Sequence, residues 1–292
     1  MRSGYISLVG RPNVGKSTLM NALIGEKISI VSARPQTTRN RVSGIFNDDR
    51  GQIVFVDTPG IHKGVGTLNK YMVDVALASL RDVDAVAVLV DATQHPGEQD
   101  RRVIAKVFDA ERPVVLVLNK IDRVPAPKLL PLIDEYRQLG EFAAIVPVSA
   151  LKSQGIDDLT ELFFTLIPEH PAYFPTDQIT EVQERFIAAE MIREKVFEMM
   201  REELPYSTAV EIEKFDEADP KILRLAAVIN VERDSQKGMM IGKGGKNLKE
   251  IGTRARKDLE QFFATKVFLE IFVRVVPDWS KSAHGLKRFG YE

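Results

Sequence analysis

The chain contains no cysteine, which excludes disulfide bonds and thiolate metal sites. It also lacks a long apolar run near its start, because the segment Tyr5–Val9 ends at Gly10 and is shorter than a signal-peptide core or a membrane span. A cytoplasmic location is therefore expected, without a transmembrane segment, and any contact with a membrane is expected to be peripheral.

Net charge is also small, at -1 over 292 residues, but it is unevenly distributed. Residues 1–175 are balanced and residues 176–232 are acidic, whereas residues 233–292 hold 13 Lys and Arg against 7 Asp and Glu. A basic segment of this kind attracts polyanions such as nucleic acid. Taken alone, it is equally typical of an ordinary solvated surface.

Short apolar segments alternate with amphipathic segments through the first half of the chain. Parallel strands buried on both faces have this composition, and the segments between them have helical spacing. The predicted fold class is therefore α/β, with a doubly wound sheet. The expected strands are residues 5–9, 42–46, 53–57, 85–91, 113–119 and 143–149, and the expected helices are residues 16–24, 68–80, 98–110, 128–139 and 156–166.

Three prolines within residues 167–175 predict an extended connection between two domains. We expect a first domain over residues 1–170, a linker over 171–180 and a second domain over 181–292. The second domain is predicted to follow the order α-β-β-α-α-β, with a glycine turn between its last two helices. Its expected elements are a helix at 181–204, strands at 208–215 and 222–231, helices at 235–241 and 246–263, and a strand at 267–276.

A glycine-bearing segment connects the first expected strand to the first expected helix. Phosphate binding requires several backbone N–H groups that converge on one anion, with a helix N-terminus behind them. We predict that Lys16 contacts the β- and γ-phosphates and that Ser17 ligates Mg²⁺. A simple strand-to-helix turn is the alternative for this motif alone. The predicted phosphate loop is Gly10, Arg11, Pro12, Asn13, Val14, Gly15, Lys16 and Ser17.

Three further motifs follow, each at the end of an expected strand, where open α/β sheets bind their ligands. Asp57 is predicted to hold Mg²⁺ through water, and the Gly60 N–H to contact the γ-phosphate. Asp122 can accept both the ring N–H and the exocyclic amine of guanine, so the predicted nucleotides are GTP and GDP. Each motif alone could be a turn or a helix cap, but their order makes chance implausible. The motifs are Asp57-Thr58-Pro59-Gly60, Asn119-Lys120-Ile121-Asp122 and Ser149-Ala150.

In the base site, Asn119 is expected to brace the loop, Lys120 to lie along the base and the Ala150 N–H to contact guanine O6. The segment Gln36-Thr37-Thr38-Arg39 is the candidate for a loop that senses the γ-phosphate. Thr38 is the preferred Mg²⁺ ligand there, Thr37 is its rival, and a solvated polar loop is the alternative.

The predicted catalytic groups are Lys16, Thr38 and Gly60. The residue after Gly60 is Ile61, whose aliphatic side chain cannot orient a water molecule. We therefore predict slow intrinsic hydrolysis that a partner could accelerate.

The glycine turn of the second domain is predicted to bind RNA. Such a turn between two helices lets a nucleic-acid backbone approach closely, while Lys243 and Lys246 neutralise phosphates. A helix C-cap is the alternative, but the basic charge and the α-β-β-α-α-β order favour a KH domain. An apolar groove is expected from Met239, Met240, Ile241, Leu248 and Ile251. The predicted RNA-binding residues are Ile241, Gly242, Lys243, Gly244, Gly245 and Lys246.

Together these motifs resemble the bacterial Era family over almost the whole chain. The resemblance also includes Pro35-Gln36-Thr37-Thr38-Arg39, Glu203-Leu204-Pro205-Tyr206-Ser207 and Val276-Pro277-Asp278-Trp279.

It implies a P-loop GTPase domain with a mixed sheet, followed by an α+β KH domain of the prokaryotic type II. It also implies binding to the 3′ end of small-subunit ribosomal RNA, a role in small-subunit assembly, partial association with the cytoplasmic membrane face and K⁺ near Asn13. We expect a monomer.

Two other functions remain open at this stage. One is a GTP-dependent switch whose second domain docks on protein, and the other is an ATPase or kinase with a coincidental Asn-Lys-x-Asp motif.

Overall fold

The structure is a computed structural model that describes residues 1–32, 34–62 and 66–291. Its internal contacts divide the chain into two compact units, and the chain passes from the first to the second between Glu181 and Val182. Two short segments, around Gln36 and around Leu68, group with the second unit, which the sequence did not suggest. Glu292, the end of the expected second domain, lies outside the described residues.

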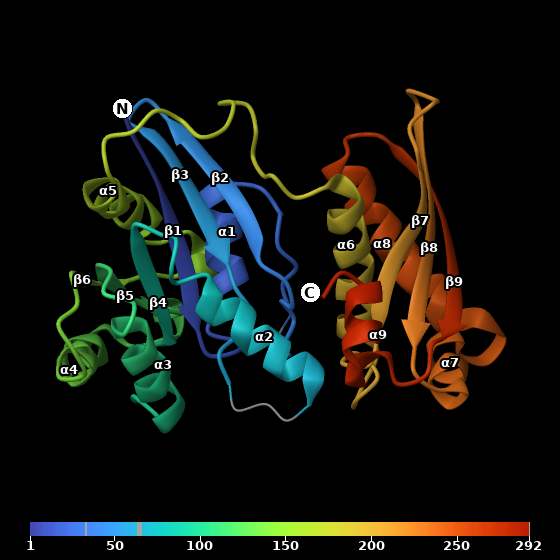
Figure 1. Ribbon diagram of the computed structural model, residues 1–292, viewed down its shortest axis with the longest axis horizontal. Coiled ribbons are helices and arrows are strands. Elements are labelled where there is room, and N and C mark those ends of the chain that lie inside the picture. The colour runs from blue at the N-terminus through green and yellow to red at the C-terminus, as the bar shows by residue number, and fades with distance from the viewer. Residues whose placement is uncertain (33, 63–65, 292) are drawn as a thin grey trace. The chain divides into compact units, whose positions relative to one another are not determined.

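The first unit is built on a six-stranded sheet with the order β2-β3-β1-β4-β5-β6 (Figure 1). Every neighbouring pair is parallel except β2 with β3, so the sheet is mixed, as expected. Strands β3, β4 and β5 are buried along their whole length, which explains their continuous apolar sequences. The strands are β1 (Arg2–Gly10), β2 (Val42–Asp48), β3 (Gly51–Asp57), β4 (Ala85–Asp91), β5 (Val114–Asn119) and β6 (Ala144–Pro147).

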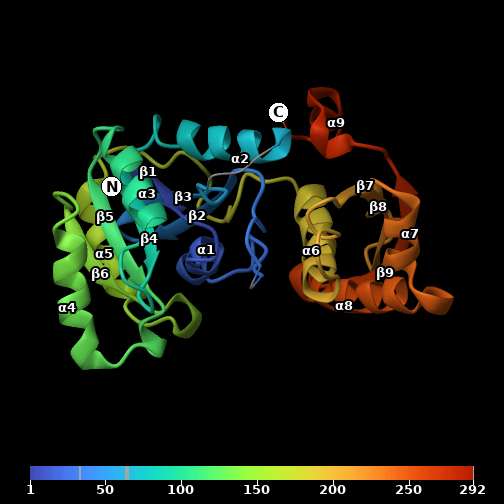
Figure 2. The same ribbon diagram turned by 90° about the horizontal axis from the view of Figure 1, so that it is seen from below.

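Helices cover both faces of this sheet, which confirms the doubly wound prediction (Figures 1 and 2). Side chains from α2, α3 and α4 share one apolar cluster with the strands, and α1 contacts α5. The predicted motifs lie at or just after the carboxyl ends of β1, β3, β5 and β6. The helices are α1 (Lys16–Ile24), α2 (Thr67–Ala78), α3 (Glu98–Phe108), α4 (Ala126–Arg137) and α5 (Ile156–Leu166), with short 3₁₀ turns η1 (Ile121–Arg123) and η2 (Ala150–Lys152).

The second unit has the predicted order α-β-β-α-α-β around a three-stranded sheet, β7-β8-β9, in which β8 and β9 are parallel. Helices α6, α7 and α8 contribute to a single apolar cluster with alternate residues of β8. Its elements are α6 (Glu184–Met199), β7 (Ala209–Asp216), β8 (Ile222–Val231), α7 (Asp234–Ile241), η3 (Lys243–Gly245), α8 (Lys246–Phe262), β9 (Lys266–Val275), η4 (Trp279–Lys281) and α9 (Ala283–Arg288).

One predicted helix is too long. The expected helix at 181–204 begins at Glu184 and ends at Met199, because Met200 takes an extended conformation. Residues 202–207 form a separate turn, in which the Ser207 N–H donates to the Glu203 carbonyl, before the chain enters β7. The terminal helix α9 was not predicted. It follows Trp279, whose buried ring anchors a small apolar cluster of its own.

Candidate functional site

The two glycines of the phosphate loop between β1 and α1 are required for different reasons. Gly15 has φ 100, in the left-handed region that favours glycine, and Asn13 also has a positive φ, 66. Gly10 does not have a positive φ. A Cβ at this position would lie 2.5 Å from the Leu89 carbonyl oxygen on β4, so Gly10 is required for close packing rather than for its dihedrals.

Four oxygen-bearing side chains converge behind this loop. Ser17 Oγ donates to Asp57 Oδ2 at 2.6 Å, and it lies 2.9 Å from Thr38 Oγ1. Ser29 Oγ also donates to Asp57 Oδ2, at 3.1 Å. The other carboxylate oxygen, Asp57 Oδ1, is buried and has no hydrogen-bond partner in the described part of the chain. Hydroxyl and carboxylate oxygens are the ligands that Mg²⁺ prefers, so this donor set fits that ion.

The structure also distinguishes the two threonines of the sensing loop. Thr38 Oγ1 lies toward Asp57 Oδ2, at 3.4 Å, whereas Thr37 Oγ1 donates to the Arg34 carbonyl at 2.9 Å. Only Thr38 therefore joins the oxygen cluster.

Lys16 is buried, with 6% of its surface exposed, and its ammonium lies against the loop itself. Its Nζ donates to the carbonyls of Gly10 and Arg11, at 3.3 Å each. Burial lowers the pKa of Lys16 to about 8, against the opposing effect of the Asp57 carboxylate. Burial likewise raises the pKa of Asp57, and Lys16 opposes that shift. A bound polyphosphate would supply the negative charge that this buried ammonium lacks.

The motif after β3 packs directly against the phosphate loop. Thr58 Oγ1 donates to the Leu8 carbonyl on β1, at 2.8 Å. Gly60 lies so close that a Cβ there would be 2.6 Å from the Pro12 nitrogen. The Ile61 N–H donates to the Gly10 carbonyl, and the Ile61 side chain is 5% exposed within the apolar core. Pro59, which precedes Gly60, is also buried.

Asn119 connects the base motifs to the phosphate loop. Its Nδ2 donates to the Val14 carbonyl at 2.8 Å, and its Oδ1 accepts from the backbone N–H of Ala150 at 3.0 Å. Ser149 Oγ donates to Asp122 Oδ1 at 2.6 Å and orients that carboxylate, which is otherwise exposed. The predicted base residues are therefore brought together, although the Ala150 N–H is engaged by Asn119.

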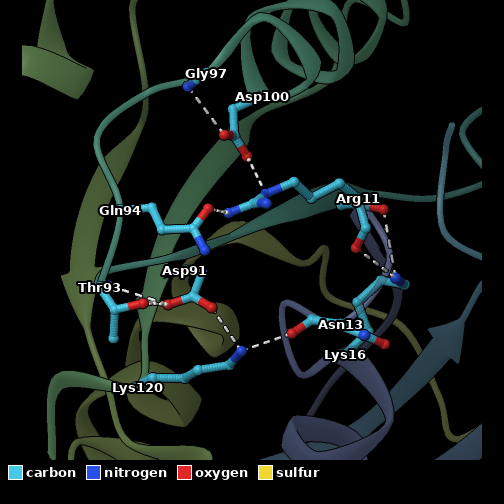
Figure 3. A network of polar contacts seen from close by, with 10 residues as sticks. Arg11, Asn13, Lys16, Asp91, Thr93, Gln94, Gly97, Asp100 and Lys120 are labelled. Atoms are coloured by element: carbon cyan, nitrogen blue, oxygen red, sulfur yellow. Dashed lines mark hydrogen bonds and ion pairs between the residues drawn. The ribbon is translucent and has the colours of Figure 1, made fainter. Parts of the chain in front are cut away.

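Lys120 ties the base loop to the phosphate loop and to β4 (Figure 3). Its Nζ donates to the Asn13 carbonyl and to Asp91 Oδ2, both at 2.6 Å. Thr93 donates to the other oxygen of Asp91. Lys120 is thereby held by partners on two other segments of the first unit. Sequence reasoning missed Asp91, although its position at the end of a buried strand is the signal that could have revealed it.

Sequence reasoning also missed Leu151, which directly follows Ala150. Its side chain is 71% exposed next to the base motifs.

In the second unit, α7 and α8 are joined by a turn in which Gly242, Gly244 and Gly245 all have positive φ, at 72, 62 and 78. Lys243 and Lys246 are exposed at this turn. These backbone conformations are strained for residues that carry a Cβ, which explains the glycines. Because glycine has no side chain, the backbone of the turn stays accessible.

A groove with a volume of about 450 Å³ begins at this turn and runs between α8 and β9. Its lining differs from the predicted set, because Met240 and Ile251 are fully buried in the core while Leu248 does line it. The eight-residue α7 carries too short a pattern to show which methionine points inward. The lining residues are Gly245, Leu248, Lys249, Gly252, Thr253, Arg256, Val267, Phe268, Leu269 and Ile271.

A mixed α/β sheet that brings four such motifs to one edge is that of a P-loop GTPase, and the second unit adds a KH domain. Family models agree. One described as a 50S ribosome-binding GTPase matches residues 5–120, and one described as a KH domain matches residues 203–280.

GTPase Era from Geobacter metallireducens is 54% identical over 99% of this chain and 98% of its own length. GTPase Era from Geotalea uraniireducens is 52% identical over 100% and 98%. The chain belongs to the Era family of GTPases.

Solved structures of this family share the whole fold. An Era structure in complex with MgGDPNP and nucleotides 1506–1542 of 16S ribosomal RNA is 42% identical, with a TM-score of 0.96 over 100% of this chain and 99% of its own. An Era variant from Aquifex aeolicus bound to GDP·AlF4⁻ gives the same identity, TM-score and coverage. Within the described part of the chain, no helix has the length and apolarity needed to cross a membrane.

Proposed function

We propose that this GTPase binds the 3′ end of small-subunit ribosomal RNA through the groove between α8 and β9 and assists assembly of the small ribosomal subunit. One observation carries the proposal. A groove with basic residues starts at the glycine turn of a KH domain, and the same chain holds the residues of a guanine-nucleotide site. The Era relative solved with MgGDPNP and 16S ribosomal RNA supports it.

The nucleotide roles follow from the geometry of the first unit. Mg²⁺ would be held by Ser17 and Thr38 directly and by Asp57 through water, and it would neutralise charge on the phosphate oxygens. When a nucleotide binds, the Lys16 ammonium would leave the carbonyls of Gly10 and Arg11 and donate to phosphate oxygens instead. This buried cation would then have an anionic partner. The Gly60 N–H donates to the γ-phosphate.

Base recognition depends on the loop that Asn119 braces. Asp122, already oriented by Ser149, accepts the two guanine donors. The Ala150 N–H then serves guanine O6 as well as Asn119 Oδ1, as a shared donor. Lys120 and the exposed Leu151 cover the two faces of the base.

Hydrolysis in this site is slow without a partner, because Ile61 is buried and offers no group that orients water. We assign K⁺ to a position beside Asn13, where a second cation would add positive charge near the phosphates. Rates measured in KCl should then exceed those in NaCl of equal concentration.

The groove suits single-stranded RNA. Its turn leaves room for a phosphate backbone and carries the exposed Lys243 and Lys246. Its lining combines apolar side chains with the exposed Lys249 and Arg256. We further propose that the protein acts as a monomer in the cytoplasm, with membrane contact only at the surface. Cell fractionation tests the location, and sedimentation of the purified chain tests the oligomeric state.

The RNA assignment is tested by Lys243→Glu combined with Lys246→Glu. For the control, Lys106→Glu is combined with Lys128→Glu, which changes the net charge equally through exposed lysines of the first unit. The probe is a single-stranded oligonucleotide of the small-subunit RNA 3′ end.

The groove variant should lose RNA affinity, and the slope of log K against log salt should fall by about 1.4, because two phosphate contacts disappear. GTP hydrolysis without RNA should be unchanged. Equal RNA binding by the two variants would favour a protein partner for this domain instead.

A further inference from the structure

Arg11 stands inside the phosphate loop, yet its side chain points away from the site where phosphates bind (Figure 3). Its Nε donates to Asp100 Oδ1 on α3 at 2.9 Å, and its Nη2 donates to Gln94 Oε1 at 2.8 Å. The guanidinium therefore uses two of its donor directions to fix the start of the loop to the segment that connects β4 with α3.

The acceptor on α3 is buried and held from several sides. The Asp100 side chain is 4% exposed, and its second oxygen accepts from the Gly97 N–H at 3.1 Å, which caps the helix. The charge of Asp100 also acts on Tyr136, whose buried hydroxyl has no hydrogen-bond partner among the described residues. Burial raises the pKa of this phenol, and the Asp100 carboxylate raises it further. The charge of Asp100 is consequently matched by Arg11 alone among the charged groups that the structure places within ion-pair distance of it.

The anchored part of the loop is also the part that positions Lys16. The carbonyls of Gly10 and Arg11 accept from the Lys16 ammonium. They belong to the two peptide groups on either side of the Arg11 Cα, whose position the Arg11 side chain fixes. If the anchor were released, these peptides could rotate and the loop would lose the open shape that receives a phosphate.

We propose that Arg11 and Asp100 form a positioning pair that preorganises the phosphate loop for the β-phosphate. This inference rests on guanine-nucleotide binding by the first unit. GDP and GTP both carry a β-phosphate, so the pair contributes equally to the affinity for each. It contributes nothing to GMP, which reaches only the base loop.

The test compares Arg11→Ala, Asp100→Asn and the double variant by calorimetry with GMP, GDP and GDPNP. Asp100→Asn retains an acceptor for the Gly97 N–H and so preserves the helix cap. Each single variant should bind GDP and GDPNP about tenfold more weakly, by the same factor, while its GMP affinity stays within about twofold of the parent. The double variant should be no weaker than the weaker single variant.

The control is Glu98→Gln, in the same first turn of α3, whose exposed carboxylate pairs with Arg102 on the surface. It should leave all three affinities unchanged. A parallel loss of GMP affinity would show a general structural defect and overturn the proposal, as would unchanged GDP binding or additive effects in the double variant. A parent protein that binds no GDP would instead refute the nucleotide site itself.

Discussion

We propose that guanine selection depends on the single carboxylate of Asp122, and Asp122→Asn tests this proposal directly. In the structure Asp122 Oδ1 accepts from Ser149 Oγ at 2.6 Å. Asparagine keeps an oxygen for that contact, so the substitution changes the chemistry presented to the base with little effect on the loop. It replaces one acceptor with an amide that donates hydrogen bonds.

The magnitude follows from the two hydrogen bonds involved. A hydrogen bond to a charged group contributes about 1.5–3 kcal/mol, and a buried donor left without a partner costs about 1–3 kcal/mol. Losing one charged bond while the guanine amine faces an amide should therefore weaken GTP binding by about 2.5–6 kcal/mol, or roughly 10²- to 10⁴-fold. Xanthine carries an oxygen in place of that amine, so the variant should gain affinity for xanthosine triphosphate.

Calorimetry with GTP, xanthosine triphosphate and ATP in excess Mg²⁺ measures these changes. The matched control is Ser149→Ala, which removes the supporting hydroxyl and should weaken GTP binding by about 2- to 13-fold without a change of preferred base. The reasoning is refuted if Asp122→Asn retains its preference for GTP over xanthosine triphosphate. It also fails if the parent chain binds ATP as tightly as GTP.

Two further predictions concern the sensing loop and the second unit. Thr38→Ala should weaken GDPNP binding about tenfold with little effect on GDP, and Thr37→Ala should leave both within about twofold, because only Thr38 faces Asp57. The opposite pattern in nucleotide titrations would reassign the ligand. Trp279→Phe should lower the free energy of unfolding by about 1–3 kcal/mol, since the buried Ser207 carbonyl loses its indole N–H donor at 3.0 Å. An unchanged denaturation midpoint would show that this bond is dispensable.

Much of the fold was readable from the sequence where local signals were strong. The bounds of α1 and α5 match their predictions, because each helix follows a glycine in the left-handed region, and α5 also has a clear apolar face. Strand β8 also matches, since its inward residues alternate along the whole segment. These elements are specified by residues close together in the chain, which is where pattern reasoning succeeds.

Features that depend on distant contacts were not readable. Asn119 was predicted only to brace its own loop, yet it joins Val14 to Ala150. The anchoring of Arg11 by Asp100 also escaped notice, because nothing in either local sequence indicates an ion pair across 89 positions. The expected groove combined residues of α7 with Leu248 and Ile251 of α8 and omitted β9, because this second wall can be identified only after the sheet order is known.

The sheet order of the second unit has a consequence for the protein's behaviour in isolation. Among the described strands β9 pairs with β8 alone, so its other rim offers main-chain amides and carbonyls to any incoming strand. A nucleic-acid occupant of the adjoining groove would shield that rim. The ligand-free protein should accordingly self-associate more readily than its complex with RNA. Added oligonucleotide should reduce this self-association.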